Sequence, residues 1–132
     1  MTWKKDAGEL KLTASEWSAL SCLWEDSPRT VMQLVADLGE RVGWAKSTTI
    51  TTLRRMEDKG LVLCTQEGRT RRYAPAVPRD RAVRGETRSF LDKVYRGSVG
   101  LMVSALAENK ALSKAEIDEL YEILRKAEEE TK

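Results

Sequence analysis

The residues with the clearest capacity for chemistry are hydroxyl and basic side chains that cluster between positions 46 and 55. The apolar spacing predicts a helix over residues 47–59, with Ile50, Leu53 and Met56 facing inward and Gly60 ending it. The predicted outer face consists of Lys46, just before the helix, and of Ser47, Thr48, Thr49, Thr51, Thr52 and Arg55.

This composition is unusual for a helix surface, because the branched threonine side chain restricts χ1 and lowers helix propensity. Short hydroxyl side chains let a helix approach DNA closely, form hydrogen bonds with base edges and phosphates, and place a methyl group against thymine. The alternative is a polar face exposed to solvent, but such faces are usually built from Glu, Lys and Gln. The pattern therefore favours a DNA-recognition helix.

A basic hairpin is predicted directly after this helix. Residues 61–64 read as a strand, 66–70 as a turn with a glycine, and 71–74 as the returning strand. Arg69, Arg71 and Arg72 lie at or near its tip, where a wing contacts the phosphate backbone or the minor groove. They could instead be solubilising charges of an edge strand. The neighbouring hydroxyl-rich helix favours DNA contact.

Two capped helices precede the hydroxyl-rich segment. Thr13 and Glu16 form a capping box, with Leu12 positioned to pack on Trp17, and the helix they begin ends at residues 26–28. A second box, formed by Thr30 and Gln33, starts a short helix that we expect Gly39 to close. Three helices followed by a hairpin is the order of a winged helix. The predicted fold is mostly α with a small β-hairpin wing, and a helical segment follows.

The charge distribution supports a polyanionic partner. Residues 41–96 carry 14 basic and 6 acidic side chains, whereas residues 1–40 carry 4 and 7, and residues 97–132 carry 5 and 8. Basic side chains gain binding free energy by displacing counterions from phosphates. A merely solvated surface would scatter the two signs along the chain, so the basic centre favours double-stranded DNA.

Other function classes lack the residues they require. The chain contains no histidine, and Cys22 and Cys64 stand alone, so neither a zinc site nor a histidine general base is expected. We expect no enzyme activity, no cofactor and no metal. No apolar run approaches the roughly 18 residues that suggest a membrane span, which predicts a cytoplasmic protein.

The C-terminal part is predicted to be a dimerisation segment. Pro75 and Pro78 mark a linker, which divides the chain into a winged-helix domain at 1–76 and a helical segment at 77–132. Three short amphipathic helices cannot close a core of their own, and a second copy of the chain is the simplest partner. The residues expected to form the homodimer are Phe90, Leu91, Val94, Val99, Met102, Val103, Leu106, Ile117, Leu120, Tyr121 and Leu124.

The order and spacing of these motifs resemble the penicillinase-repressor (BlaI/MecI/CopY) family over nearly the whole chain. The matching stretches are Leu12-Thr13-x-x-Glu16-Trp17 with Leu23-Trp24, Thr48 to Gly60, Glu67-Gly68-Arg69 with Tyr73, Phe90-Leu91 to Gly97, and Leu112-Ser113 to Leu124. The resemblance implies a homodimeric repressor that occupies a palindromic operator until a signal releases it. A winged helix can also bind an acidic protein partner, which is the alternative function.

The resemblance also implies ways of release. In the penicillinase branch, a regulatory protease cuts an Asn-Phe bond in the short helix of the dimerisation region. The corresponding bond is Ala105-Leu106, which has neither residue. In the copper branch, release depends on C-terminal cysteines, and this chain has none after Cys64.

Overall fold

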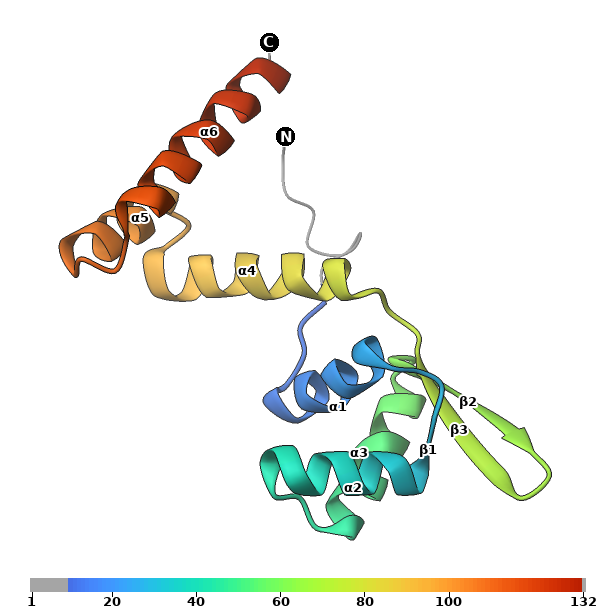
Figure 1. Cartoon of the computed structure of the whole chain (residues 1–132). Coiled ribbons are helices and arrows are strands. Elements are labelled where there is room, and N and C mark those ends of the chain that lie inside the picture. The colour runs from blue at the N-terminus through green and yellow to red at the C-terminus, as the bar shows by residue number, and fades with distance from the viewer. Residues whose placement is uncertain (1–9, 132) are drawn as a thin grey trace. The chain divides into compact units, whose positions relative to one another are not determined.

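A computed structural model describes residues 10–131. The chain forms two compact units, and the division between them falls after Ser89. The elements follow one another in the order shown in Figure 1. They are α1 (Ala14–Glu25), β1 (Arg29–Thr30), α2 (Val31–Val42), α3 (Lys46–Asp58), β2 (Val62–Glu67), β3 (Thr70–Pro75), α4 (Arg79–Tyr95), α5 (Val99–Glu108) and α6 (Lys114–Glu130). The predicted mostly helical fold with a hairpin wing is confirmed.

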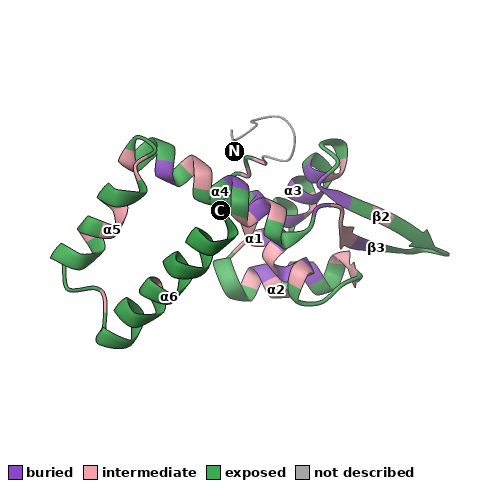
Figure 2. Ribbon diagram, turned by 90° about the horizontal axis from the view of Figure 1, so that it is seen from above, coloured by how far each residue is buried: buried purple, intermediate pink, exposed green. Residues whose placement is uncertain are grey.

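The first unit is a winged helix whose three helices enclose one core. Figure 2 shows the buried residues concentrated in α1, α2, α3 and the base of the hairpin. Leu20, Leu34, Leu38, Leu53 and Met56 are fully or almost fully buried. This core fixes the back of α3, so its opposite face remains at the surface.

Local capping sets the helix starts. Both predicted boxes are present: Thr13 accepts from the Glu16 amide and Thr30 accepts from the Gln33 amide. The predicted end of the second helix is wrong, because α2 continues through Gly39 to Val42. Gly43 ends it instead, in a left-handed conformation with φ of 72° and its amide donating to the Gly39 carbonyl.

The hairpin is longer than the sequence indicates. Strands β2 and β3 pair antiparallel from Val62 opposite Pro75 to Glu67 opposite Thr70, which leaves a two-residue turn. The sheet has a third strand that was not predicted, β1, in the order β1-β3-β2. Arg29 pairs with Tyr73, and Thr30, which is also the N-cap of α2, pairs with Arg72.

The first unit extends beyond the predicted boundary between residues 76 and 77. Val77 and Ala82 are buried, and the Trp24 indole donates a 3.0 Å hydrogen bond to the Val77 carbonyl. The start of α4 also lies against the chain that enters α1. A Cβ atom on Gly85 would lie 2.8 Å from the backbone nitrogen of Leu10, which leaves no room for a side chain.

The second unit comprises the end of α4 with α5 and α6. Ser98 caps α5, and Ser113 and Glu116 form the predicted capping box of α6. No residue of α5 or α6 is buried, and Figure 2 shows both helices in the exposed and intermediate colours. Within residues 10–131, no helix combines the length and apolarity that crossing a membrane requires.

Candidate nucleic-acid interface

Helix α3 presents a continuous exposed stripe to solvent. Lys46, Ser47, Thr48, Thr51 and Arg55 are all exposed, as predicted for a helix that contacts DNA. Leu53 and Met56 anchor the opposite face in the core. The stripe therefore consists of hydroxyl groups over the first half of the helix and a guanidinium further along it.

Thr49 and Thr52 do not belong to this stripe, and their predicted place on the outer face is corrected. Thr49 is 0% exposed and Thr52 is 8% exposed. Helical periodicity explains the difference, because position 49 shares a face with 52, 53 and 56. Ile50, predicted to face inward, is only half-buried. The Thr49 hydroxyl has no hydrogen-bond partner in the structure.

Two further residues join the exposed surface beside α3. Arg54 is exposed and lies three residues after Thr51 and seven after Ser47, so helical spacing alone could have placed it on the stripe. Ser15, in the first turn of α1, lines a shallow hollow of about 280 Å³ with Ser47, Thr48, Thr51, Thr52 and Arg55. Nothing in the sequence indicates that this turn of α1 lies beside α3.

A second hollow, of about 210 Å³, connects α1 to the C-terminal half of α3. Glu16, Lys59 and Arg55 line it together with Thr13, Ser15 and Thr52. The Glu16 carboxylate accepts from the Thr13 amide at 2.9 Å and from the Lys59 ammonium at 2.6 Å. Burial raises the pKa of this carboxyl, but the hydrogen bonds from Lys59 and Thr13 outweigh burial, and the net pKa lies below its ordinary value.

The three arginines of the wing differ in their partners. Arg71 donates to the Cys64 sulfur at 3.3 Å, lies 3.4 Å from the Glu57 carboxylate and stacks over the Tyr73 ring. The bond to Cys64, with the nearby Tyr73, raises the pKa of Arg71. Arg72 pairs with Glu67 at 3.2 Å. Arg69 is exposed and has no ion pair with any residue in the described part of the chain.

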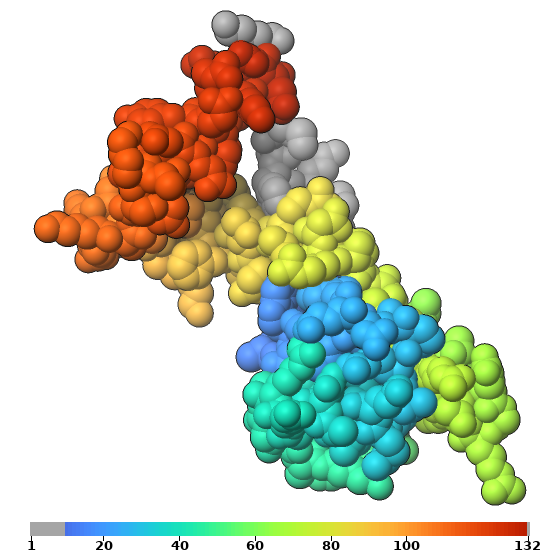
Figure 3. All heavy atoms as spheres, in the orientation of Figure 1, coloured from blue at the N-terminus to red at the C-terminus, as the bar shows by residue number. Residues whose placement is uncertain are grey.

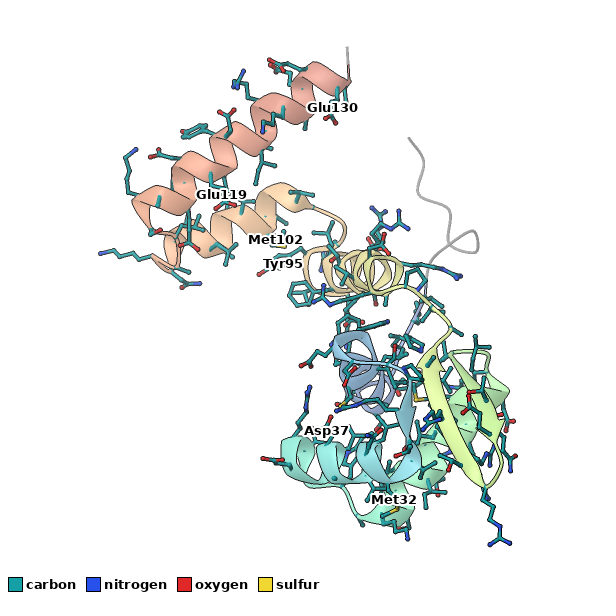
Figure 4. The ribbon with its side chains drawn as sticks, turned by 45° about the vertical axis from the view of Figure 1, so that its right-hand side comes forward. Met32, Asp37, Tyr95, Met102, Glu119 and Glu130 are labelled. Atoms are coloured by element: carbon teal, nitrogen blue, oxygen red, sulfur yellow. The ribbon has the colours of Figure 1, made fainter. Side chains whose placement is uncertain are left out.

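The wing also faces the N-terminus of α2. A hollow of about 450 Å³ between them is lined by Thr30, Val31, Met32, Arg69, Thr70 and Arg71. Figure 4 labels Met32 on α2, where its side chain is exposed, and Figure 3 shows the hairpin projecting from the first unit. The arginines are thus placed on a protruding element beside a helix start.

An ionic network holds α2 in place. Arg29 of β1 contacts Asp37, which Figure 4 labels on α2, and Arg41 pairs with Glu25 at the end of α1. Burial raises the pKa of the nearby Cys22 thiol, which is consistent with a packing role. Among residues 10–131, no group of three or more Cys, Asp or Glu side chains is arranged to hold a metal ion.

Comparison with known proteins identifies the family of this winged helix. Residues 12–126 match the sequence profile of the family described as penicillinase repressor. The chain belongs to this family. The penicillinase repressor of Bacillus licheniformis is 30% identical over 114 residues, which are 86% of this chain and 89% of that protein. The methicillin resistance regulatory protein MecI of Staphylococcus aureus (strain N315) is 23% identical over 116 residues, or 88% of this chain and 94% of MecI.

A solved structure agrees with the fold. The solution structure of the DNA binding domain of the repressor BlaI matches 54% of this chain and 87% of that domain, with a TM-score of 0.50 and 22% identity. Members of the penicillinase repressor family are DNA-binding transcriptional repressors and not enzymes. The predicted family, fold and class of function are therefore confirmed.

In this member of the penicillinase repressor family, most of the predicted dimerisation residues are exposed. Leu91 is the exception, at 8% exposure, and Met102, Val103 and Leu120 are half-buried. Leu101 and Ile123 are also exposed, although they were not predicted. The remaining predicted residues are all exposed: Phe90, Val94, Val99, Leu106, Ile117, Tyr121 and Leu124. The predicted cleavage position, Ala105-Leu106, lies inside α5 near its end.

Proposed function

We propose that this protein is a sequence-specific repressor that binds a palindromic operator as a homodimer and blocks transcription sterically in the cytoplasm. The observation that carries the proposal is the exposed stripe of Ser47, Thr48, Thr51 and Arg55 on α3, which lies beside the start of α1. The wing contacts the same helix through the ion pair between Arg71 and Glu57. Helices of this kind enter the major groove, where hydroxyl groups and methyl groups meet base edges.

Each part of the interface has a distinct role in this proposal. Thr48 and Thr51 contact base edges, while Lys46 and Arg55 contact phosphates and fix the register of α3 on the duplex. Arg69 supplies the wing contact, since its guanidinium is not committed to another side chain in the described residues. Arg71 and Arg72 contribute less, because each must first leave the carboxylate it pairs with.

The homodimer is supported by what α5 and α6 leave exposed. Tyr121 and Leu124 are 71% and 62% exposed, and neither helix contains a buried residue. An apolar surface of this kind on a short helical segment marks an interface. A second copy of the chain covers this apolar surface with its own. The resulting homodimer links two winged helices, which raises the avidity for two half-sites by roughly 10² to 10⁴.

Release by proteolysis at Ala105-Leu106 is the regulatory part of the proposal. The bond lies inside α5, with Val99 and Leu101 before it and Leu106 and the exposed residues of α6 after it, so cleavage there divides the dimerisation surface. Because α5 contains no buried residue, little packing opposes the local unwinding that a protease requires. Mass spectrometry of the repressor from induced cells tests this, and an intact chain after induction contradicts it.

Selection of bound duplexes from a random DNA pool tests the main proposal. We expect an enriched palindrome with two half-sites spaced by about one helical turn or a multiple of it. Thr48→Val and Thr51→Val should then change the preferred bases. A pool without enrichment, combined with binding to an acidic protein, would instead support a protein-interaction module.

A further inference from the structure

The capping box of α1 does more than start the helix, because its glutamate also contacts a distant element. One oxygen of the Glu16 carboxylate accepts from the Thr13 amide at 2.9 Å, which completes the box. The other accepts from the Lys59 ammonium at 2.6 Å, across 43 positions of the sequence. Lys59 is the C-cap residue of α3. A single side chain therefore joins the start of α1 to the end of the helix that presents the hydroxyl stripe.

Capping alone does not account for this arrangement. The box of α2 uses a neutral glutamine, Gln33, for the same hydrogen bonds. The box of α6 uses Glu116, which is exposed and has no ion pair with any residue between 10 and 131. Glu16, in contrast, is 5% exposed and carries a charge. A buried carboxylate is costly unless it is paired, so its presence here requires Lys59.

The position of the pair explains what it can control. Glu16 and Lys59 line the same hollow as Arg55 and Thr52 of α3. The ion pair between Glu16 and Lys59 lies at the C-terminal end of α3, where the helix dipole also favours a cation. Holding this end against α1 restricts rotation of α3 about its axis, and that rotation decides which hydroxyl groups face the bases.

We propose that Glu16 is a positioning residue that, through Lys59, sets the orientation of α3 and thereby the specificity of DNA binding. This rests on the proposed function of α3. Contacts to base edges need short, directional hydrogen bonds, whereas attraction to phosphates tolerates small displacements. Breaking the ion pair between Glu16 and Lys59 therefore lowers the affinity for the operator and leaves the affinity for random DNA nearly unchanged. The Lys59 side chain is 55% exposed, so its charge stays available to phosphates when Glu16 is neutral.

A double-mutant cycle on the full-length protein tests this proposal. Glu16→Gln keeps the capping hydrogen bonds, as Gln33 does in α2, and removes the charge. Lys59→Gln removes the other partner, and both variants are combined. Binding is measured on the selected operator and on a random duplex of the same length, at a temperature where circular dichroism shows every variant to be folded.

For Glu16→Gln we expect about tenfold weaker operator binding, within the range for coupled pairs, and random-DNA binding within about twofold of the wild type. The double variant should lose no more operator affinity than the single variant that loses more. The matched control is Asp118→Asn, which breaks the exposed Lys114–Asp118 pair of α6 and should leave both affinities unchanged.

Three results would overturn the proposal: equal losses on both DNAs, no loss on either, or additive losses in the double variant. Additive losses accompanied by a lower salt dependence for Lys59→Gln would make Lys59 a direct phosphate contact instead. If the wild-type protein does not distinguish operator from random DNA, the proposed function fails at the outset. A specific wild-type protein with an uncoupled pair refutes only the role of Glu16.

Discussion

The hydroxyl of Thr49 is buried in the core side of α3 without a hydrogen-bond partner. An unsatisfied buried polar atom costs about 1–3 kcal/mol, and an apolar group of the same shape avoids that cost. Thr49→Val should therefore raise the free energy of unfolding by about 1 kcal/mol. Urea denaturation followed by circular dichroism measures the change, with Thr51→Val as the exposed control.

The same variant distinguishes the two placements of Thr49. Because its side chain is buried, Thr49→Val should leave operator affinity unchanged, whereas Thr48→Val should alter it. A loss of specific binding in Thr49→Val, without loss of stability, would show instead that Thr49 belongs to the face that contacts DNA. Composition made Thr49 look like a surface residue, and only its spacing from Leu53 and Met56 indicates otherwise.

Glu16 makes folding sensitive to acid. Burial raises its pKa, but the hydrogen bonds from Lys59 and Thr13 bring the net pKa in the folded state below the ordinary value. A lowered pKa stabilises the fold above the unfolded-state value of roughly 4.3, and this stabilisation disappears as the pH falls through the folded-state pKa. The melting temperature of the wild type should therefore decline over that acidic range.

Glu16→Gln should flatten this part of the pH profile, since the variant has no carboxyl to protonate at position 16. Glu119→Gln, at an exposed position of α6 labelled in Figure 4, serves as the control and should keep the wild-type slope. Parallel profiles for wild type and Glu16→Gln would show that other carboxyl groups dominate the acid sensitivity.

At the scale of elements, helix α2 contains one glycine inside it and one at its end. Gly39 lies within the helix, where an added Cβ would make ordinary contact at 3.6 Å, whereas Gly43 has a φ of 72°. Gly39→Ala should stabilise the protein by up to about 1 kcal/mol through helix propensity. Gly43→Ala should destabilise it by about 1 kcal/mol, because an L side chain is strained at positive φ. Denaturant midpoints of the two variants should move in opposite directions, and a shared direction would contradict the observed end of α2.

The wing gives a prediction based on electrostatics. Removing one phosphate contact reduces the slope of log affinity against log salt by about 0.9. Arg69→Ala should show this change on operator and random DNA alike. Arg71→Ala should show less, because its guanidinium is engaged by Cys64 and Glu57. Arg125→Ala, in α6, is the control for a change in total charge, and an unchanged slope in Arg69→Ala would remove the wing tip from the interface.

The sequence predicts local features of these elements better than contacts between distant segments. Thr13 with Glu16, Thr30 with Gln33 and Ser113 with Glu116 each define a helix start within four residues, and all three boxes form. Strand β1 has only two residues and forms because β3 lies beside it, so no local sequence pattern predicts it. The bond from Glu16 to Lys59 and the place of Ser15 beside α3 likewise depend on how helices pack.

For the whole molecule, the two units differ in how they are stabilised. The first unit has a buried core of leucines with Met56 and Tyr73, and α5 and α6 of the second have no buried residue. The proline pair at 75 and 78 suggested a boundary near residue 76, but prolines mark a change of direction and not the end of packing. Val77 and Ala82 remain buried after it, and the chain divides after Ser89.

This division predicts the behaviour of two truncated proteins. A fragment ending at Ser89 should fold, sediment as a monomer and bind a single half-site weakly, because it keeps the winged helix and lacks the apolar surface of α5 and α6. A fragment ending at Ala76 loses the burial of Val77, worth about 1.5–3 kcal/mol, and the hydrogen bond from Trp24, worth about 1 kcal/mol. It should therefore unfold at a lower urea concentration. Equal midpoints for the two fragments would place the boundary at residue 76, and a dimeric fragment ending at Ser89 would remove α5 and α6 from the dimer interface.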